Sequence, residues 1–145
     1  MAASARLPRS LAESMGFLVA RIAQQGAELM QAHLDAFGIK ARHFGVLAVL
    51  AENGPLSQQA VGDLLRIDRT TMVALVDDLE QRGLAIRRAD QRDRRAYRVE
   101  LSEAGRETLE RADAAVTAAN EQLVAPLRPA DQRQLLALLR QLSRV

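Results

Sequence analysis

The chain has 145 residues, with 20 Lys and Arg against 18 Asp and Glu, two His and no Cys. This length suits one compact domain, and the lack of cysteine excludes disulfides, thiolate metal ligands, cysteine nucleophiles and thiol redox sensing. Two histidines are too few for a zinc site, so we expect no metal and no cofactor. Because the sequence has no apolar run of transmembrane length and no signal-peptide pattern at its start, we expect a cytoplasmic protein that does not enter the membrane.

Basic charge is concentrated in one short segment. Six arginines and two aspartates fall between Arg87 and Arg98, whereas the whole chain has a net charge of only +2. A concentrated basic segment in a nearly neutral chain indicates an anionic partner.

The first third of the chain has the periodicity of helices. Apolar residues recur at spacings of three, four or seven between Leu7 and Phe37, which predicts one long amphipathic helix that Gly38 ends. A second helix is predicted over 41–52, before the helix-ending run Asn53-Gly54-Pro55.

Two shorter helices follow. Ser57 is a good N-cap for a helix that runs to about residue 66, and Asp68 for a helix over 69–82 that Gly83 closes. The inward residues expected on the first of these helices are Ala60, Val61, Leu64 and Leu65. Those expected on the second are Met72, Leu75, Val76 and Leu79.

Beyond the fourth helix the apolar period changes to two. Alternation predicts two short strands, 84–87 and 96–101, joined by a wide charged loop over 89–95. Helix is predicted again over 102–124, with Ser102 as its N-cap, and a last helix over 130–144.

The predicted elements divide the chain into three segments. Residues 39–101 form a helix–helix–helix–hairpin unit, flanked by helical segments 1–38 and 102–145. The apolar stripes of the flanking helices exceed what a small monomer can cover, so we expect them to pack across a homodimer interface. The predicted fold is mainly α with a small β-hairpin. It is a winged helix-turn-helix module flanked by N- and C-terminal dimerisation helices, with one compact domain per subunit.

The third and fourth helices have the spacing of a helix-turn-helix. The start of the second of them would present five residues to solvent: Arg69, Thr70, Thr71, Val73 and Ala74. Basic and hydroxyl side chains at a helix N-terminus suit the phosphates and base edges of a DNA major groove. The acidic residues further along would restrict such contact to the first turns; they are Asp77, Asp78 and Glu80. The alternative is an ordinary two-helix corner with a polar surface.

The charged loop follows directly after this helix pair. Its three arginines would enter the neighbouring minor groove as a wing: Arg92, Arg94 and Arg95. Asp90 and Asp93 would order these arginines by bidentate pairing. The alternative for this loop alone is a solvated charged turn.

Four stretches make a larger pattern: Gly54-Pro-Leu-Ser57, the run from Ile67 to Leu84, the wing from Arg87 to Ala96, and Leu101-Ser-Glu-Ala-Gly105. Together they resemble the multiple-antibiotic-resistance regulator (MarR) family of bacterial winged-helix repressors. The resemblance implies a homodimer on a pseudo-palindromic double-stranded DNA operator.

The resemblance also implies the roles of individual residues. By position, the residues that match backbone or base contacts are Ser57, Gln58, Arg69, Thr70 and Thr71, and the wing contacts are Arg92, Arg94 or Arg95. Where the family often has Thr and Arg, this chain has Val73 and Ala74, which leaves the operator sequence open.

The family resemblance further implies a small aromatic acid or drug-like effector in a cleft between the dimer helices and the winged module. Candidates that could pair a carboxylate with an apolar slot are Arg21, His33, Phe37, His43 and Phe44. The alternative is that the histidines are polar edges of helix packing, the phenylalanines core residues and the arginine a surface residue.

We therefore expect a DNA-binding transcriptional regulator, a repressor, and not an enzyme. Two isolated histidines and no Gly-rich phosphate loop offer no convergent catalytic group. The other open interpretation is a winged-helix module that binds a protein without binding DNA. Salt separates the two, because binding through many Arg–phosphate contacts weakens steeply as salt rises.

Overall fold

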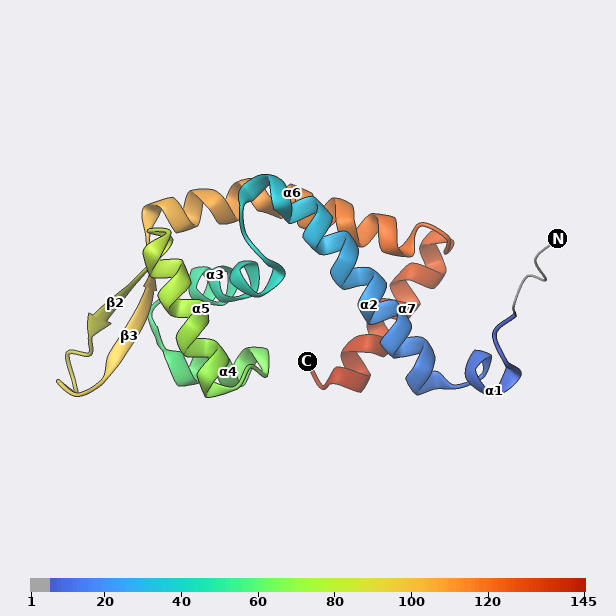
Figure 1. Ribbon diagram of the computed structural model, residues 1–145, viewed down its shortest axis with the longest axis horizontal. Helices are drawn as coiled ribbons and strands as arrows, with labels where there is room; N and C mark the ends of the chain where they lie inside the picture. Colours follow the sequence, from blue (N-terminus) through green and yellow to red (C-terminus); the bar gives the residue numbers. More distant parts are fainter. Residues whose placement is uncertain (1–5) are drawn as a thin grey trace.

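The structure is a computed structural model that describes residues 6–145; the first five residues of the predicted dimerisation segment 1–38 lie outside the described residues. Figure 1 shows two lobes under one long helix. The elements are α1 (Arg9–Ala12), α2 (Met15–Leu34), a 3-10 turn η1 (Asp35–Phe37), α3 (Ala41–Asn53), β1 (Leu56–Ser57), α4 (Gln58–Leu65), α5 (Arg69–Gln81), β2 (Ala85–Ala89), β3 (Tyr97–Leu101), α6 (Glu103–Val124) and α7 (Pro129–Ser143). We call α3 to β3, residues 41–101, the head, and α1, α2 and α7 the arm.

The prediction of one continuous helix from Leu7 to Phe37 is wrong. The chain makes the short helix α1, breaks, and starts again at α2, where the Ser14 hydroxyl accepts the Phe17 N–H at 3.4 Å. Ser14 has an extended backbone and acts as an N-cap, a local effect that apolar periodicity cannot reveal. The predicted stop is confirmed, since Gly38 adopts a left-handed φ of 66°.

The head is a three-helix unit with a small antiparallel sheet. The predicted N-caps are confirmed, because Ser57, Asp68 and Ser102 each accept a backbone N–H three residues on. The strand order is β1-β3-β2, with Val99 of β3 opposite both Leu56 and Arg87. Only two strands were predicted, because β1 has two residues and is too short to show alternation.

The core of the head follows the predicted helix faces with one exception. All four inward residues predicted on α5 are buried. On α4, Val61 is buried, but Leu64 is 61% exposed and its predicted burial is wrong. The reason is that α4 turns Val61 and Gly62 inward, and a Cβ on Gly62 would lie 2.9 Å from the Ile67 carbonyl oxygen.

Helix α6 joins the two lobes. Its first turn lies so close to the start of β2 that a Cβ on Gly105 would collide with the Leu84 carbonyl oxygen. Ala112 belongs to the same buried cluster as the head, and α6 runs beside α2 in the other lobe (Figure 1). The predicted boundary after residue 101 therefore falls within one packed body.

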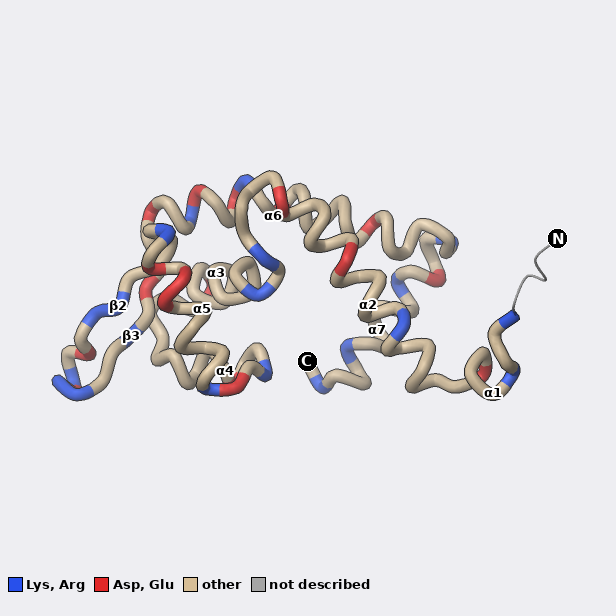
Figure 2. The backbone as a smooth tube through the Cα atoms, in the orientation of Figure 1, with Lys and Arg blue, Asp and Glu red and all other residues tan. Residues whose placement is uncertain are grey.

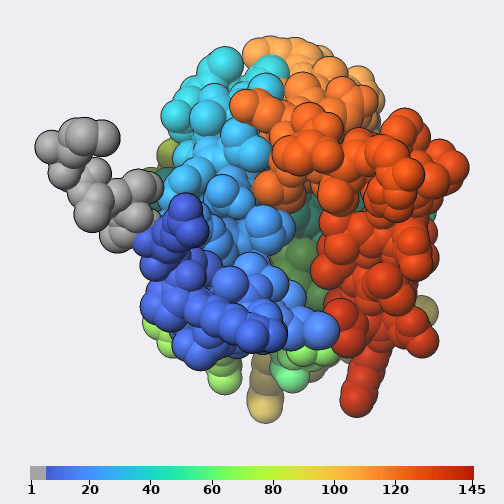
Figure 3. All heavy atoms as spheres, turned by 90° about the vertical axis from the view of Figure 1, so that its right-hand side faces the viewer, coloured from blue at the N-terminus to red at the C-terminus, as the bar shows by residue number. Residues whose placement is uncertain are grey.

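The arm leaves a large apolar surface uncovered. Viewed from its end, α1 and α2 stand opposite α7 with a recess between them (Figure 3). The exposed apolar residues of the arm include Leu11, Met15, Leu18, Val19, Ile22, Leu136, Leu138, Leu139 and Leu142. No helix within residues 6–145 combines the length and apolar character needed to cross a membrane.

Candidate nucleic-acid interface

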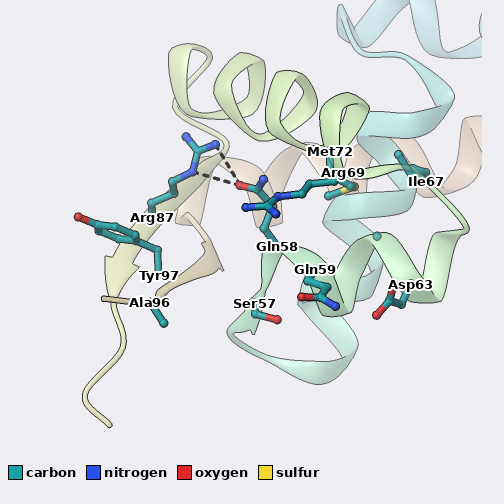
Figure 4. A pocket seen from close by; sticks show the side chains of 11 residues that line it. Ser57, Gln58, Gln59, Asp63, Ile67, Arg69, Met72, Arg87, Ala96 and Tyr97 are labelled. Atoms are coloured by element: carbon teal, nitrogen blue, oxygen red, sulfur yellow. Dashed lines mark hydrogen bonds between the residues drawn. The ribbon is translucent and has the colours of Figure 1, made fainter. Parts of the chain in front are cut away.

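A cleft of about 560 Å³ opens where the starts of α4 and α5 meet the root of the hairpin. Figure 4 shows that Gln58 and Gln59 line it from α4 and Ser57 from the N-cap of that helix. Arg69 lines it from α5, and Arg87 and Tyr97 from the strands. The tandem helices and the adjacent hairpin, which we call the wing, thus form one continuous surface.

The first turns of α5 carry the exposed residues that the sequence predicted. Arg69, Thr70, Val73 and Ala74 are exposed. Thr71 is half-buried, and its hydroxyl donates to Asp68 Oδ2 at 2.6 Å. Hydrogen bonds from the Thr71 hydroxyl and backbone hold the pKa of Asp68 below its usual range. Thr71 therefore supplies both hydrogen bonds to the capping Asp68, and its role as a DNA contact stays a prediction.

Ser57 and Gln58 lie at the start of α4, as predicted. Ser57 is exposed and caps the helix. The Gln58 side-chain carbonyl accepts from Arg87 Nε at 3.3 Å and Nη2 at 3.1 Å, so its NH₂ group remains as the donor toward the cleft.

Arg87 is the central residue that sequence reasoning missed. Its Nη1 lies 2.6 Å from Asp77 Oδ1 and 2.5 Å from Glu80 Oε2, and its backbone N–H donates to Glu80 Oε1 at 2.8 Å. Burial acts to lower the pKa of the Arg87 guanidinium, but hydrogen bonds to both carboxylates outweigh it and raise that pKa. One arginine of the wing thus pairs with two acids of α5 and neutralises one of their two negative charges.

The third acidic residue of α5 is also compensated. Asp78 Oδ2 lies 3.0 Å from Arg82 Nε and 2.8 Å from His43 Nε2. Figure 2 shows these acidic positions near the end of α5 and basic positions around the wing tip. The expected restriction of phosphate contacts to the first turns of α5 agrees with this distribution of charge.

The wing tip is ordered in a different way from the one predicted. Asp90 Oδ1 accepts the backbone N–H of Arg92 at 2.9 Å, and Asp93 Oδ1 accepts that of Arg95 at 2.9 Å. Asp90 Oδ2 accepts Arg98 Nε at 3.0 Å. The bidentate pairing with tip arginines is wrong, because a short Asp side chain reaches the backbone N–H two residues on. The bond from the Arg92 backbone and then that from Arg98 lower the pKa of Asp90.

As a result, the tip arginines extend into solvent. Arg92, Arg94 and Arg95 are exposed, and none makes a side-chain ion pair within the described part of the chain. Tyr97 at the wing root is also exposed and borders the cleft. Tyr97 alternates in phase with Val99 and Leu101 along β3, but the wing extends beyond the core at this point, so Tyr97 has no core to enter.

The five predicted effector residues have separate surroundings. Arg21 is exposed on α2, and His33 Nε2 lies 3.1 Å from Gln122 Oε1 of α6. The Phe37 ring is half-buried with the Arg111 guanidinium 5.8 Å from its centroid.

Two of the five residues lie in the head. Phe44 is half-buried against the core. His43 is only 2% exposed, and both its ring nitrogens are occupied, by the Lys40 N–H at 3.1 Å and by Asp78. An effector role for these five residues stays a prediction. Residues 6–145 contain no cluster of three His, Asp or Glu side chains able to hold a metal ion.

Comparison with known proteins extends the similarity from the winged unit to the whole chain. The model described as MarR family matches residues 37–96. A putative transcriptional regulatory protein for the hcr operon of Thauera aromatica is 34% identical over 107 residues, which are 74% of this chain and 64% of that protein. The matched region thus spans less than two thirds of that relative's length.

Solved structures match over almost their full length. A probable transcriptional regulator from Pseudomonas aeruginosa is 36% identical with a TM-score of 0.85, covering 91% of this chain and 98% of that one. CouR from Rhodococcus jostii RHA1, bound to p-coumaroyl-CoA, is 28% identical with a TM-score of 0.81, covering 93% and 95%. The transcriptional repressor CouR on a 23-mer DNA duplex is 28% identical with a TM-score of 0.89, covering 96% and 99%.

Proposed function

Because the chain belongs to the MarR family of winged-helix transcriptional regulators, we propose that it is a homodimeric repressor of a pseudo-palindromic operator. In this proposal, the first turns of α5 enter the major groove of each half-site, and the wing tip enters the flanking minor groove. The observation that carries the proposal is the exposed set Arg92, Arg94 and Arg95, held on a loop whose aspartates bond its own backbone.

The charge on the neighbouring helix supports the same surface. Unpaired carboxylates on α5 would repel phosphates, but Asp77 and Glu80 are paired with Arg87 and Asp78 with Arg82. The face made by the starts of α4 and α5 and by the wing therefore carries a net attraction for a polyanion.

The dimer in this proposal uses the arm. Exposed leucines of α7 and the apolar side chains of α1 and α2 form a surface too large for an isolated soluble monomer. A two-fold dimer through the arm would hold two heads, as a pseudo-palindrome requires.

Release by a small aromatic ligand completes the proposal. CouR, a relative with the same fold, binds p-coumaroyl-CoA. A ligand between arm and head would favour a spacing of the two α5 helices that does not match both half-sites. Since both ring nitrogens of His43 are occupied, Arg21, His33, Phe37 and Phe44 are the better candidates for its contacts.

The test is selection from a random duplex library, with affinity then measured at two salt concentrations. We expect an inverted repeat with half-sites about one helical turn apart. Arg92→Ala and Arg95→Ala should each weaken binding to all sequences. Each should also reduce the salt slope by about two, because a contact worth about 0.9 per phosphate occurs twice in a dimer.

The matched control is Arg106→Ala, which removes an exposed arginine of α6 beside the opposite end of α5. Salt-insensitive binding, or wing variants equal to the control, would overturn the proposal and favour a protein partner.

A further inference from the structure

The outer side of α5 changes from polar to apolar after its first turn. Arg69 and Thr70 are exposed, and the next outward residues are Val73, which is 40% exposed, and Ala74. One turn further, the Asp77 carboxylate is held by Arg87 at 2.6 Å. The second turn of α5 therefore presents only apolar side chains, with charged or polar groups on both sides along the helix.

This apolar surface is not explained by packing within the chain. The buried side of α5 is formed by Met72, Leu75, Val76 and Leu79, and Val73 lies outside that set. The exposed apolar surface of the arm belongs to the other lobe of the molecule (Figure 1). Val73 instead lies on the surface that carries Arg69 and the basic wing. The positive charge of this surface is complementary to nucleic acid.

The major groove offers one apolar group to such a side chain. Every base pair presents hydrogen-bonding edges there, and only thymine adds a C5-methyl group. A valine pressed against a guanine or cytosine edge would remove water from polar atoms without replacing its hydrogen bonds, which is costly. Against thymine, the same valine buries a methyl group.

We propose that Val73 is a specificity-determining residue that contacts the C5-methyl of a thymine in each half-site, and that the small Ala74 lets the helix approach the base edges closely. This inference rests on the proposed function and specifies the operator base that α5 selects. Sequence discrimination by the second turn of α5 then comes from apolar contact, and hydrogen bonding is left to Arg69, Thr70 and Gln58.

The experiment uses the whole 145-residue chain and an operator obtained by selection. Each thymine of a half-site is replaced in turn by deoxyuridine, which removes the C5-methyl and leaves every hydrogen-bonding atom in place. At one thymine we expect wild-type affinity to fall roughly fourfold per replaced half-site, the value for one buried methyl group. When the replacement is made in both half-sites the loss should be roughly fifteenfold.

Val73→Ala tests which residue makes the contact. In this variant the deoxyuridine effect at that thymine should disappear, while the salt slope stays at its wild-type value. Leu64→Ala, which removes an exposed apolar side chain at the far end of α4, is the matched control and should keep the full effect.

The outcomes separate the inference from the proposed function. If the protein selects a salt-sensitive operator but no deoxyuridine effect depends on Val73, the inference is overturned and the repressor proposal stands. If no duplex is selected at all, both fall together.

Discussion

His43 belongs to a chain of hydrogen bonds that joins the linker after α2 to α5. Its Nδ1 accepts the Lys40 N–H, so in the neutral ring the proton is on Nε2, which donates to Asp78 Oδ2 at 2.8 Å. Arg82 donates to the same oxygen and, through Nη1, to the Gly38 carbonyl at 2.5 Å. The linker after α2 and the last turn of α5 are therefore held together by polar contacts on both sides of one carboxylate.

The buried ring makes stability depend on pH. Burial lowers the pKa of His43 below 6.5, and the Asp78 carboxylate opposes this shift only in part. The unfolded chain thus takes up a proton at a pH where the folded chain does not. Stability is complete above about pH 6.5 and is lost as the pH falls toward the folded pKa. The midpoint of urea unfolding should be lower at pH 5.5 than at pH 7.5.

His43→Gln should flatten this pH dependence, with His33→Gln as the matched control. A profile that keeps the wild-type slope after His43→Gln would contradict the assignment to His43. The structure also explains why sequence reasoning left His43 between two interpretations: its partner Asp78 lies 35 positions away on another helix, and no local pattern encodes that contact.

At the scale of the element, the wing is attached to both helices of the helix-turn-helix. Arg87 of β2 bonds Gln58 of α4 and both Asp77 and Glu80 of α5. Arg87→Met keeps the aliphatic stem but leaves two carboxylates uncompensated beside the cleft. DNA binding should weaken by at least about tenfold for every sequence, since the loss of one positive charge near a phosphate costs roughly 1 kcal/mol in each of the two heads of the proposed dimer.

Charge restoration checks this explanation. Adding Asp77→Asn and Glu80→Gln to Arg87→Met should recover much of the lost affinity, with circular dichroism unchanged throughout. If the triple variant binds no better than Arg87→Met, the loss comes from a displaced wing and not from repulsion.

The sequence predicted these elements to different degrees. Helices of eight or more residues were found because their apolar periods and caps are local, as for α5 between Asp68 and Gly83. The two-residue β1 and the break at Ser14 were missed, because neither changes the period over a long enough stretch. The exposed residues of the interface were predicted, whereas the Arg87 contacts and the Asp90–Arg98 bond depend on the approach of other elements.

For the whole molecule, the apolar side of α7 should determine the oligomeric state. Leu136 and Leu139 are 51% and 44% exposed. Leu139→Glu would place a charge in the proposed dimer interface and should shift the protein to monomers in sedimentation velocity, with a large loss of operator affinity. Gln134→Glu, an exposed change on the same helix, is the control. If the wild-type protein sediments as a monomer, the proposed dimer through the arm is wrong.

The length of α6 converts small movements of the arm into large movements of the head. A helix of 22 residues is a rod of about 33 Å at 1.5 Å per residue. If the rod tilts by about 10° at its arm end, the other end moves by roughly 6 Å, nearly two base-pair steps of about 3.4 Å. In the proposed mechanism α6 would act as a lever, and an effector at the arm would need to displace its surroundings by only a fraction of the distance over which operator binding is lost.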